Sequence, residues 1–265
     1  LIGRHLTLEC YVFTRRARPL APSSMNPDAH RLWRGPRWTL AVLLACLGML
    51  ACCWARADVE TFMDLRNIAA VQGDAAAGKA NSATCAACHM QDGISVVPLF
   101  PNLAGQHAEY MYWRMREIQQ EARADSPMTA LLANLDDTQL RNFSAWYASL
   151  PPAQHAEPAR GAASHASEGA RIWSEGDATR GIPPCQGCHG RKAEGHPLAA
   201  EVIRWRMVPI LRGQAAAYVT QRLNAYRDGA HTVTSSARMM NGAAANLDDA
   251  SIEALAKWIE TGESK

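Results

Sequence analysis

Two copies of one short pattern define the chemistry of this chain. They are Cys85-Ala-Ala-Cys88-His89 and Cys185-Gln-Gly-Cys188-His189. Two cysteines three positions apart match the two vinyl groups of one porphyrin, with which they form thioethers. The histidine that follows then lies beneath the iron as its proximal ligand. The sequence therefore predicts two covalently attached haem c groups, bound by these four cysteines, with His89 and His189 as proximal iron ligands.

Two other uses of paired cysteines fit the pattern less well. A structural zinc site needs more thiolates or histidines at one place than a single copy supplies. A thioredoxin-like dithiol is expected in a βαβ context, without the following histidine. Repetition of the whole five-residue pattern favours haem over both.

Residues 1–57 are expected to precede the working protein. Met25 offers a start of translation, which makes residues 1–24 an upstream extension. Basic residues then precede an apolar run from Trp38 to Trp54, and Ala55-Arg56-Ala57 has the small-x-small pattern of a cleavage site. Because the run is shorter than a bilayer span, we expect a cleaved signal peptide and export of the mature protein.

Removal of residues 1–57 changes the cysteine content and the charge. The cysteines outside the two motifs all lie there: Cys10, Cys46, Cys52 and Cys53. The full chain has 27 basic and 25 acidic residues, and residues 1–57 contain 8 and 2 of them, which leaves 19 and 23. This net charge of −4 does not indicate nucleic-acid binding. A retained membrane anchor, lipid attachment at Cys46 or Cys52, and peripheral association with a membrane stay open.

The remaining sequence repeats itself with a period near 110 residues. Pro101-Asn-Leu-Ala-Gly-Gln106 matches Pro209-Ile-Leu-Arg-Gly-Gln214, and Met128 and Met240 each precede a Leu-Asp-Asp by seven residues. This period is too long for a solenoid unit and fits a duplicated domain. The expected parts are a first domain at 58–152, a linker at 153–166 and a second domain at 167–265.

Both halves are predicted to be helical. Asp136 can cap a helix whose third residue is Gln139, with apolar residues at helical spacing up to Pro151, and Asp248 begins the same pattern in the second half. Further helical segments are expected at 75–87, 107–120 and 215–226. Since no segment alternates strongly enough to predict a strand, we expect an all-α fold of two tandem domains, each wrapped around one haem.

The repeat also separates the candidates for the sixth iron ligand. Among the methionines that follow the motifs, only Met128 and Met240 occupy equivalent places, whereas Met239 aligns with a proline. Met111 and Met115 lie on one helical face and are predicted to be core residues. Several histidines have no counterpart in the other half: His107, His155, His165, His196 and His231. We expect Met128 and Met240 as ligands, with His231 open as an alternative at the second haem.

Pro101 and Pro209 suggest a further role beside the irons. A proximal histidine usually donates its other ring N–H to a backbone carbonyl, which fixes the orientation of the ring. A proline gives such a carbonyl a rigid backbone. A plain turn fits the spacing equally well.

With these motifs the chain resembles the class I cytochromes c, and as a tandem pair it resembles dihaem cytochromes of the cytochrome c4 type. The resemblance covers nearly all of residues 73–265. In that family the matching methionines are the distal ligands, and the matching prolines carry the carbonyl that meets the proximal histidine. The resemblance implies these roles for Met128, Met240, Pro101 and Pro209.

The sequence departs from the family pattern at two places. Met90 stands where a glycine usually follows the haem histidine. The stretch from His189 to Pro209 is also eight residues longer than its partner from His89 to Pro101. It includes Arg204-Trp205-Arg206-Met207, which fits either a partner-docking surface or an ordinary insertion.

The expected function is one-electron transfer without catalysis. An iron bound by histidine and methionine has no open position for a substrate, and thioether sulfur raises its reduction potential. The resemblance implies a periplasmic carrier between redox protein partners, from a quinol-oxidising complex to a terminal oxidase, with no small-molecule substrate. The alternative is the cytochrome subunit of a flavin- or quinone-dependent dehydrogenase, such as sulfide dehydrogenase. A dihaem peroxidase would need one haem able to open its sixth position.

Overall fold

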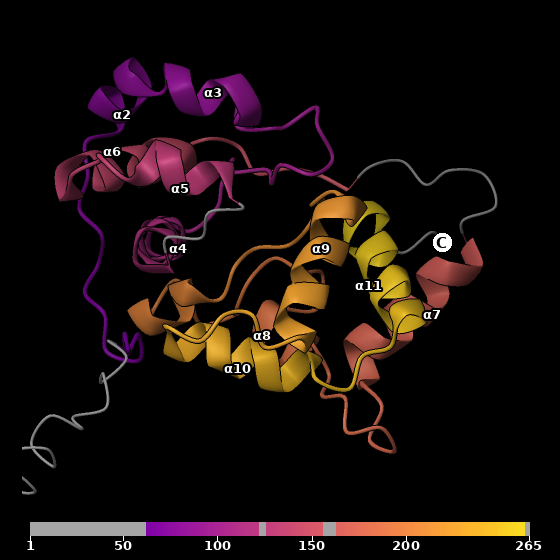
Figure 1. Ribbon diagram of the computed structural model, residues 1–265. Helices are drawn as coiled ribbons and strands as arrows, with labels where there is room; N and C mark the ends of the chain where they lie inside the picture. Colours follow the sequence, from indigo (N-terminus) through magenta and orange to yellow (C-terminus); the bar gives the residue numbers. More distant parts are fainter. Residues whose placement is uncertain (1–61, 122–125, 156–162, 263–265) are drawn as a thin grey trace, which may run out of the picture. The chain divides into compact units, whose positions relative to one another are not determined.

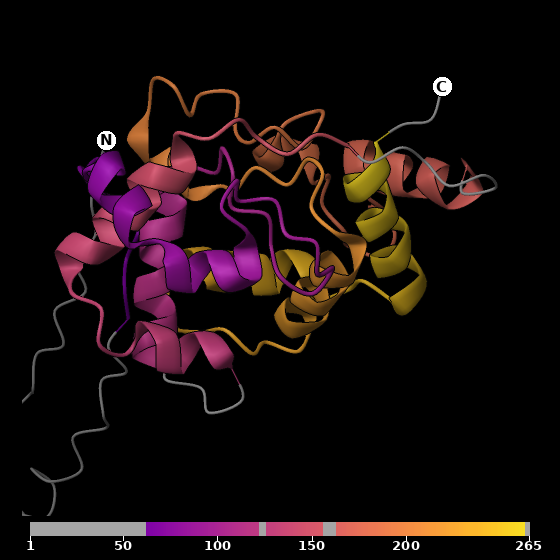
Figure 2. The ribbon, with the colours of Figure 1, turned by 90° about the horizontal axis from the view of Figure 1, so that it is seen from above.

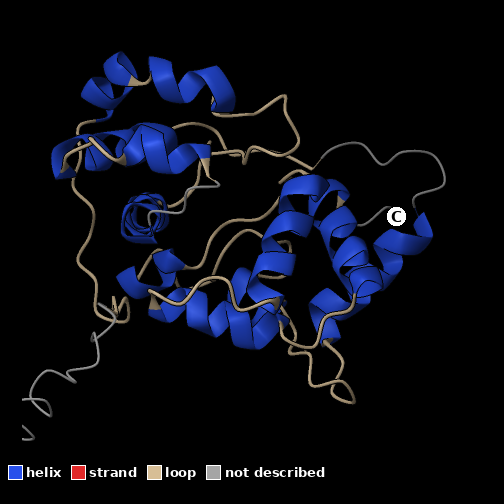
Figure 3. Ribbon diagram, in the orientation of Figure 1, coloured by secondary structure: helices blue, strands red, loops and turns tan. Residues whose placement is uncertain are grey.

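Every regular element in the described part of the chain is a helix, as the sequence predicts (Figure 3). The computed structural model describes residues 62–121, 126–155 and 163–262. The expected extension, signal peptide and lipidation cysteines lie outside these residues. Extended segments meet in isolated bridges, Met63 with Thr234 and Asp177 with Ile182. No helix of the described residues combines the length and the apolar character that a membrane crossing requires.

The helices divide between the two halves of the repeat (Figure 1). The first half contains α2 (Ala75–Asn81), α3 (Ala83–His89), α4 (Ala108–Glu121), α5 (Pro127–Leu132) and α6 (Asp137–Ala148). The second half contains α7 (Ala163–Glu175), α8 (Gln186–His189), the 3-10 helix η1 (Ile203–Met207), α9 (Ala216–Arg227), α10 (Ser235–Ala244) and α11 (Asp249–Thr261).

The last helix of each half begins as its capping sequence predicts. The Asp136 side chain accepts from the backbone N–H of Gln139, whose own side chain accepts from the Asp136 N–H, a complete capping box. Asp248 accepts from the Ser251 N–H in the same way. The continuous helix expected over 75–87 is instead broken at Ser82, whose fully buried hydroxyl donates to the Lys79 carbonyl at 2.8 Å.

Each half closes by a tight crossing of its first and last helices. A Cβ added at Gly78 of α2 would lie 2.1 Å from the Asn142 carbonyl oxygen of α6. In the second half, a Cβ at Gly169 of α7 would lie 2.2 Å from the Ala254 carbonyl oxygen of α11. Only glycine permits this approach. Figure 2 shows α11 beside α7, and α9 also contacts α11.

The longer loop of the second half contacts the first half. Its helix η1 packs against α4. There Arg206 lies 3.4 Å from the buried carboxylate of Glu109 and donates to the Ala199 carbonyl at 2.9 Å. The ring of Trp205 stacks on His196 with 3.8 Å between centroids. Of the two interpretations of this loop, these contacts favour a structural insertion for Arg206, whereas Arg204 is exposed.

Candidate haem centres

Both haem motifs lie at short helices that end at the proximal histidine. Cys85, Cys88 and His89 all belong to α3, where the i, i+3, i+4 spacing places them on one face. Cys185 caps α8, which contains Cys188 and His189. Each motif therefore presents two sulfur atoms and one imidazole from a single helical turn.

The residue after each histidine has a left-handed backbone. Met90 has φ 60° and Gly190 has φ 82°. With ψ of 163° and 161°, both residues lie in a region that glycine adopts freely and that costs another residue about 1–3 kcal/mol. Met90 thus makes the positive-φ turn that Gly190 makes in the second half, with strain that glycine avoids.

The proximal histidines are buried and oriented by the two prolines. The Nδ1 atom of His89 lies 2.9 Å from the Pro101 carbonyl oxygen, and that of His189 lies 3.2 Å from the Pro209 carbonyl oxygen. Because a carbonyl only accepts, Nδ1 carries the proton and the Nε2 lone pair is left for a metal. Burial lowers the pKa of both imidazoles, and the carbonyl contact partly opposes it. Each ring is therefore neutral, the form that binds iron.

The surroundings of Cys85 and Cys185 disfavour a thiolate. None of the four forms a disulfide with another described cysteine. Burial raises the pKa of the Cys85 thiol, and it raises that of Cys185 to about 11. A dithiol catalyst or a zinc ligand needs a thiolate, which these surroundings disfavour. The environment therefore argues against both alternatives to haem.

An apolar cavity adjoins the second motif. His189, Cys185, Pro209 and Met240 all line it. Four residues of the first half also line this cavity: Leu65, Tyr110, Arg114 and Glu117. A site with a neutral imidazole, a thioether and apolar walls fits a haem.

Comparison with known proteins agrees with this geometry. The family model for cytochrome c matches residues 75–151 and 166–263. The chain belongs to the cytochrome c family. Cytochrome c4 of Pseudomonas aeruginosa is 34% identical over 198 residues, which cover 75% of this chain and 93% of that protein.

The crystal structure of reduced recombinant cytochrome c4 from Pseudomonas stutzeri has a TM-score of 0.61 and 33% identity. The match covers 71% of this chain and 98% of the chain in that crystal structure. A protein named thiosulfate dehydrogenase electron acceptor, from Thiomonas intermedia, is 30% identical over 185 residues, 69% of this chain and 81% of its own length. This chain is therefore a dihaem cytochrome of the c4 type, with two tandem helical domains and two covalently bound haem c groups, as predicted.

The methionines of this dihaem cytochrome differ in how deeply they are buried. Met240 lies in α10 and lines the cavity beside the second motif, while its neighbour Met239 is 63% exposed. Met128 is half-buried at the start of α5 and packs on the Tyr112 and Leu132 cluster. Met111 is buried as expected of a core residue. Met207, which follows the second motif but has no equivalent methionine in the first half, also lines the cavity beside the second motif.

His231 is engaged at both ring nitrogens. Its Nδ1 lies 2.9 Å from Glu121 Oε1, and its Nε2 accepts from Arg222 at 2.9 Å. Neither nitrogen is free in this arrangement, which argues against His231 as the alternative ligand of the second haem.

Two glutamines link the proximal loops of the two domains. Gln106 donates to the Ile210 carbonyl at 2.8 Å and accepts from the Ile210 N–H at 3.0 Å. Gln214 likewise donates to the Asn102 carbonyl at 2.6 Å and accepts from the Asn102 N–H at 2.9 Å. Asn102 and Ile210 each follow the proline whose carbonyl meets a proximal histidine. Each domain thus supports the proximal loop of the other, a role signalled in the sequence only by the repeated Gly-Gln.

Proposed function

We propose that this dihaem cytochrome carries single electrons through the bacterial periplasm, from a quinol-oxidising complex to a terminal oxidase or a similar acceptor. In this proposal His89 and Met128 bind the first iron, and His189 and Met240 bind the second. The observation that carries it is the apolar cavity lined by both His189 and Met240. The four motif cysteines would form the thioethers.

The proposed ligand sets suit electron carriage. When bound, a haem iron supplies a reversible one-electron couple, and the protein tunes it through its axial ligands and their hydrogen bonds. The Pro101 and Pro209 carbonyls fix the imidazole orientation. With both axial positions filled by protein atoms, a substrate finds no place to bind at either iron.

Replacement of each methionine tests the ligand assignment. We expect Met128→Ala and Met240→Ala each to abolish about half of the sulfur-to-iron charge-transfer band of the oxidised protein. Met239→Ala is the matched control and should leave the band unchanged, because Met239 is exposed. If the band survives at full intensity in both variants, the assignment is wrong. Ready binding of carbon monoxide by the native reduced protein would contradict the carrier function.

A second candidate partner comes from the relatives. The similarity to a protein named thiosulfate dehydrogenase electron acceptor supports the alternative that this cytochrome accepts electrons from a dehydrogenase. Stopped-flow reduction of the oxidised protein decides between the two donors. Rapid reduction by a purified quinol-oxidising complex, and not by thiosulfate dehydrogenase with thiosulfate, would support the main proposal, and the opposite result would support the alternative.

A further inference from the structure

The helix that carries Met240 begins on residues of the other domain. Thr234 is the N-cap of α10, where its hydroxyl oxygen accepts from the Ala237 N–H at 3.0 Å. The same hydroxyl donates to Oε1 of Glu117, in α4 of the first domain, at 3.2 Å. Thr234 is 2% exposed and Glu117 is 5% exposed, so water does not compete for this contact. The start of α10 is therefore fixed by a carboxylate of the first domain.

The backbone around Thr234 is fixed by the first domain as well. The Met63 N–H donates to the Val233 carbonyl at 2.8 Å, and the Ser235 N–H donates to the Met63 carbonyl at 3.0 Å. The Leu65 N–H donates to the Ser235 hydroxyl at 2.9 Å. These bonds leave little freedom for the chain that enters α10.

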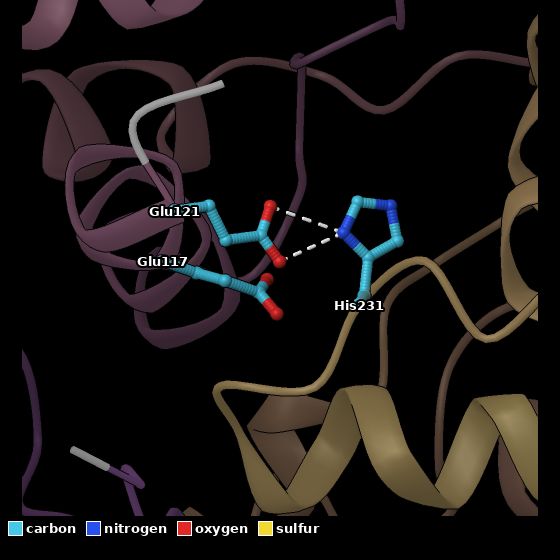
Figure 4. Close-up of side chains that lie close together, drawn as sticks. All are labelled: Glu117, Glu121 and His231. Atoms are coloured by element: carbon cyan, nitrogen blue, oxygen red, sulfur yellow. Dashed lines mark hydrogen bonds and ion pairs between the residues drawn. The ribbon is translucent and has the colours of Figure 1, made fainter. Parts of the chain in front are cut away.

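A third contact lies three residues earlier, at His231. Figure 4 shows the Glu121 carboxylate facing Nδ1 of His231, with Glu117 beside it on α4. Burial alone would raise the pKa of Glu121, but the His231 contact and the nearby arginines lower it, so the group is a carboxylate. The Asn241 amide, next to Met240, donates to the His231 carbonyl at 2.6 Å. The His231 loop thus connects Glu121 to the residue beside the proposed ligand.

The Glu117, Glu121 and His231 cluster is better explained by hydrogen bonds than by a metal ion. One ligand atom of each lies within 4.8 Å of the others. However, Arg222 donates to Nε2 of His231, so the proton of the neutral ring is on Nδ1, directed at Glu121. A metal at Nδ1 would move that proton to Nε2, against a guanidinium. Arg114 also neutralises Glu117, at 2.5 Å.

The first domain has a different arrangement at its own methionine helix. Gln119 of α4 donates to the carbonyls of Leu132 and Leu135, at 2.7 and 3.0 Å, and so fixes the end of α5 from within the same domain. By the repeat that relates Tyr110 to Tyr218, the counterparts of Glu117 and Glu121 are Ala225 and Gly229. Neither has a carboxylate to offer the first domain.

We infer that Glu117 and Glu121 are positioning residues for Met240, so that the first domain sets how readily the distal ligand of the second haem dissociates. The inference rests on the proposed ligand assignment. Met128, in contrast, is positioned within its own domain through Gln119. Docking of the domains would then tune one haem and leave the distal side of the other unaffected.

The expected effect follows from the loss of a charge-assisted hydrogen bond. Glu117→Ala leaves the Thr234 hydroxyl without its buried acceptor and allows the first turn of α10 to open. We expect the equilibrium for dissociation of Met240 to rise about tenfold, the change that such a bond typically contributes. Glu117→Gln removes the charge but retains an acceptor oxygen, so its effect should be clearly smaller.

The experiment uses cyanide titration of the oxidised protein in two backgrounds. With Met128→His, the sulfur-to-iron band reports only the second haem, and with Met240→His only the first. Glu117→Ala should raise cyanide affinity about tenfold at the second haem and less than twofold at the first. Gln119→Ala, two residues away on the same helix, is the matched control and should show the reverse.

Each other outcome has a defined meaning. Equal effects of Glu117→Ala at both haems, or equal effects of Glu117→Ala and Glu117→Gln, would overturn the positioning role. If Glu117→Ala does not incorporate haem, Glu121→Gln is measured in its place, and unchanged cyanide affinity at the second haem would refute the inference. If Met240→His fails to remove part of the band, the ligand assignment falls and this inference falls with it. A normal loss of band without a Glu117 effect rejects the inference alone.

Discussion

The two haem domains share a motif but differ in how they are packed. In the second domain the ring centroids of Trp173 and Trp258 lie 4.6 Å apart inside a large buried cluster. In the first, Trp146 occupies the place of Trp258 but is only half-buried, with the Lys79 ammonium 5.2 Å from its ring. The buried cluster around Tyr112, Leu132 and Leu140 is also much smaller. The two halves thus share the haem motif, while the larger apolar core lies in the second half.

Replacement of the two equivalent tryptophans should give the largest difference in stability between the two domains. Trp258→Ala removes a ring that is 3% exposed and leaves a cavity, for which we expect a loss of about 3–5 kcal/mol in stability. Trp146→Ala removes a half-exposed ring and should cost about 1–2 kcal/mol. Guanidinium unfolding of the holoprotein, followed at the haem absorbance, measures both. Equal losses would show that the unequal cores do not determine stability.

The glutamine pair offers a symmetric test of the interface. Gln106→Ala removes two hydrogen bonds to the loop of Pro209, and Gln214→Ala removes two from the loop of Pro101, each change costing about 1–2 kcal/mol. Because each glutamine supports the proximal loop of the other domain, Gln106→Ala should shift mainly the potential of the second haem. Gln214→Ala should shift mainly that of the first.

Spectroelectrochemical titration in the Met128→His and Met240→His backgrounds separates the two potentials. A shift confined to the haem of the substituted domain would contradict the crossed arrangement. Asn142→Ala serves as a control in the first domain, since its side chain accepts only from Asp74 of that domain among the described contacts.

Local patterns predicted much of this molecule because their causes are local. The capping box at Asp136 depends on residues three apart, and the haem motif depends on one helical turn. The repeat singled out Met128 and Met240, and in the structure Met240 lines the cavity beside the second motif. Their roles as iron ligands remain predictions.

Other features depend on contacts that no local pattern encodes. The break lies at Ser82, which is buried and donates its hydroxyl to the Lys79 carbonyl, and no proline or glycine marks it in the sequence. Glu117 and Thr234 are 117 positions apart, and Arg206 and Glu109 are 97 apart. In the sequence a charge in an amphipathic helix looks like a solvated residue. The first domain already gives Glu117 and Glu109 the partners Arg114 and Val71. Packing of the second domain on α4 adds Thr234 and Arg206.

The longer loop of the second domain gives the smallest expected effect on stability. Arg206→Ala should lower the free energy of unfolding by about 1 kcal/mol. Glu109 is 3% exposed, and among its described partners it would keep only the Val71 N–H, at 3.3 Å. The loss stays small because the arginine itself is one-third exposed. Arg204→Ala is the matched control. Arg204 is exposed and lies 5.1 Å from the Trp205 ring, so its loss should change stability by less than about 0.5 kcal/mol. Thermal unfolding of both variants measures the difference. If instead Arg204→Ala alone slows electron exchange with a redox partner at unchanged stability, the exposed part of the loop is a docking surface, and the two arginines divide the structural and the binding role between them.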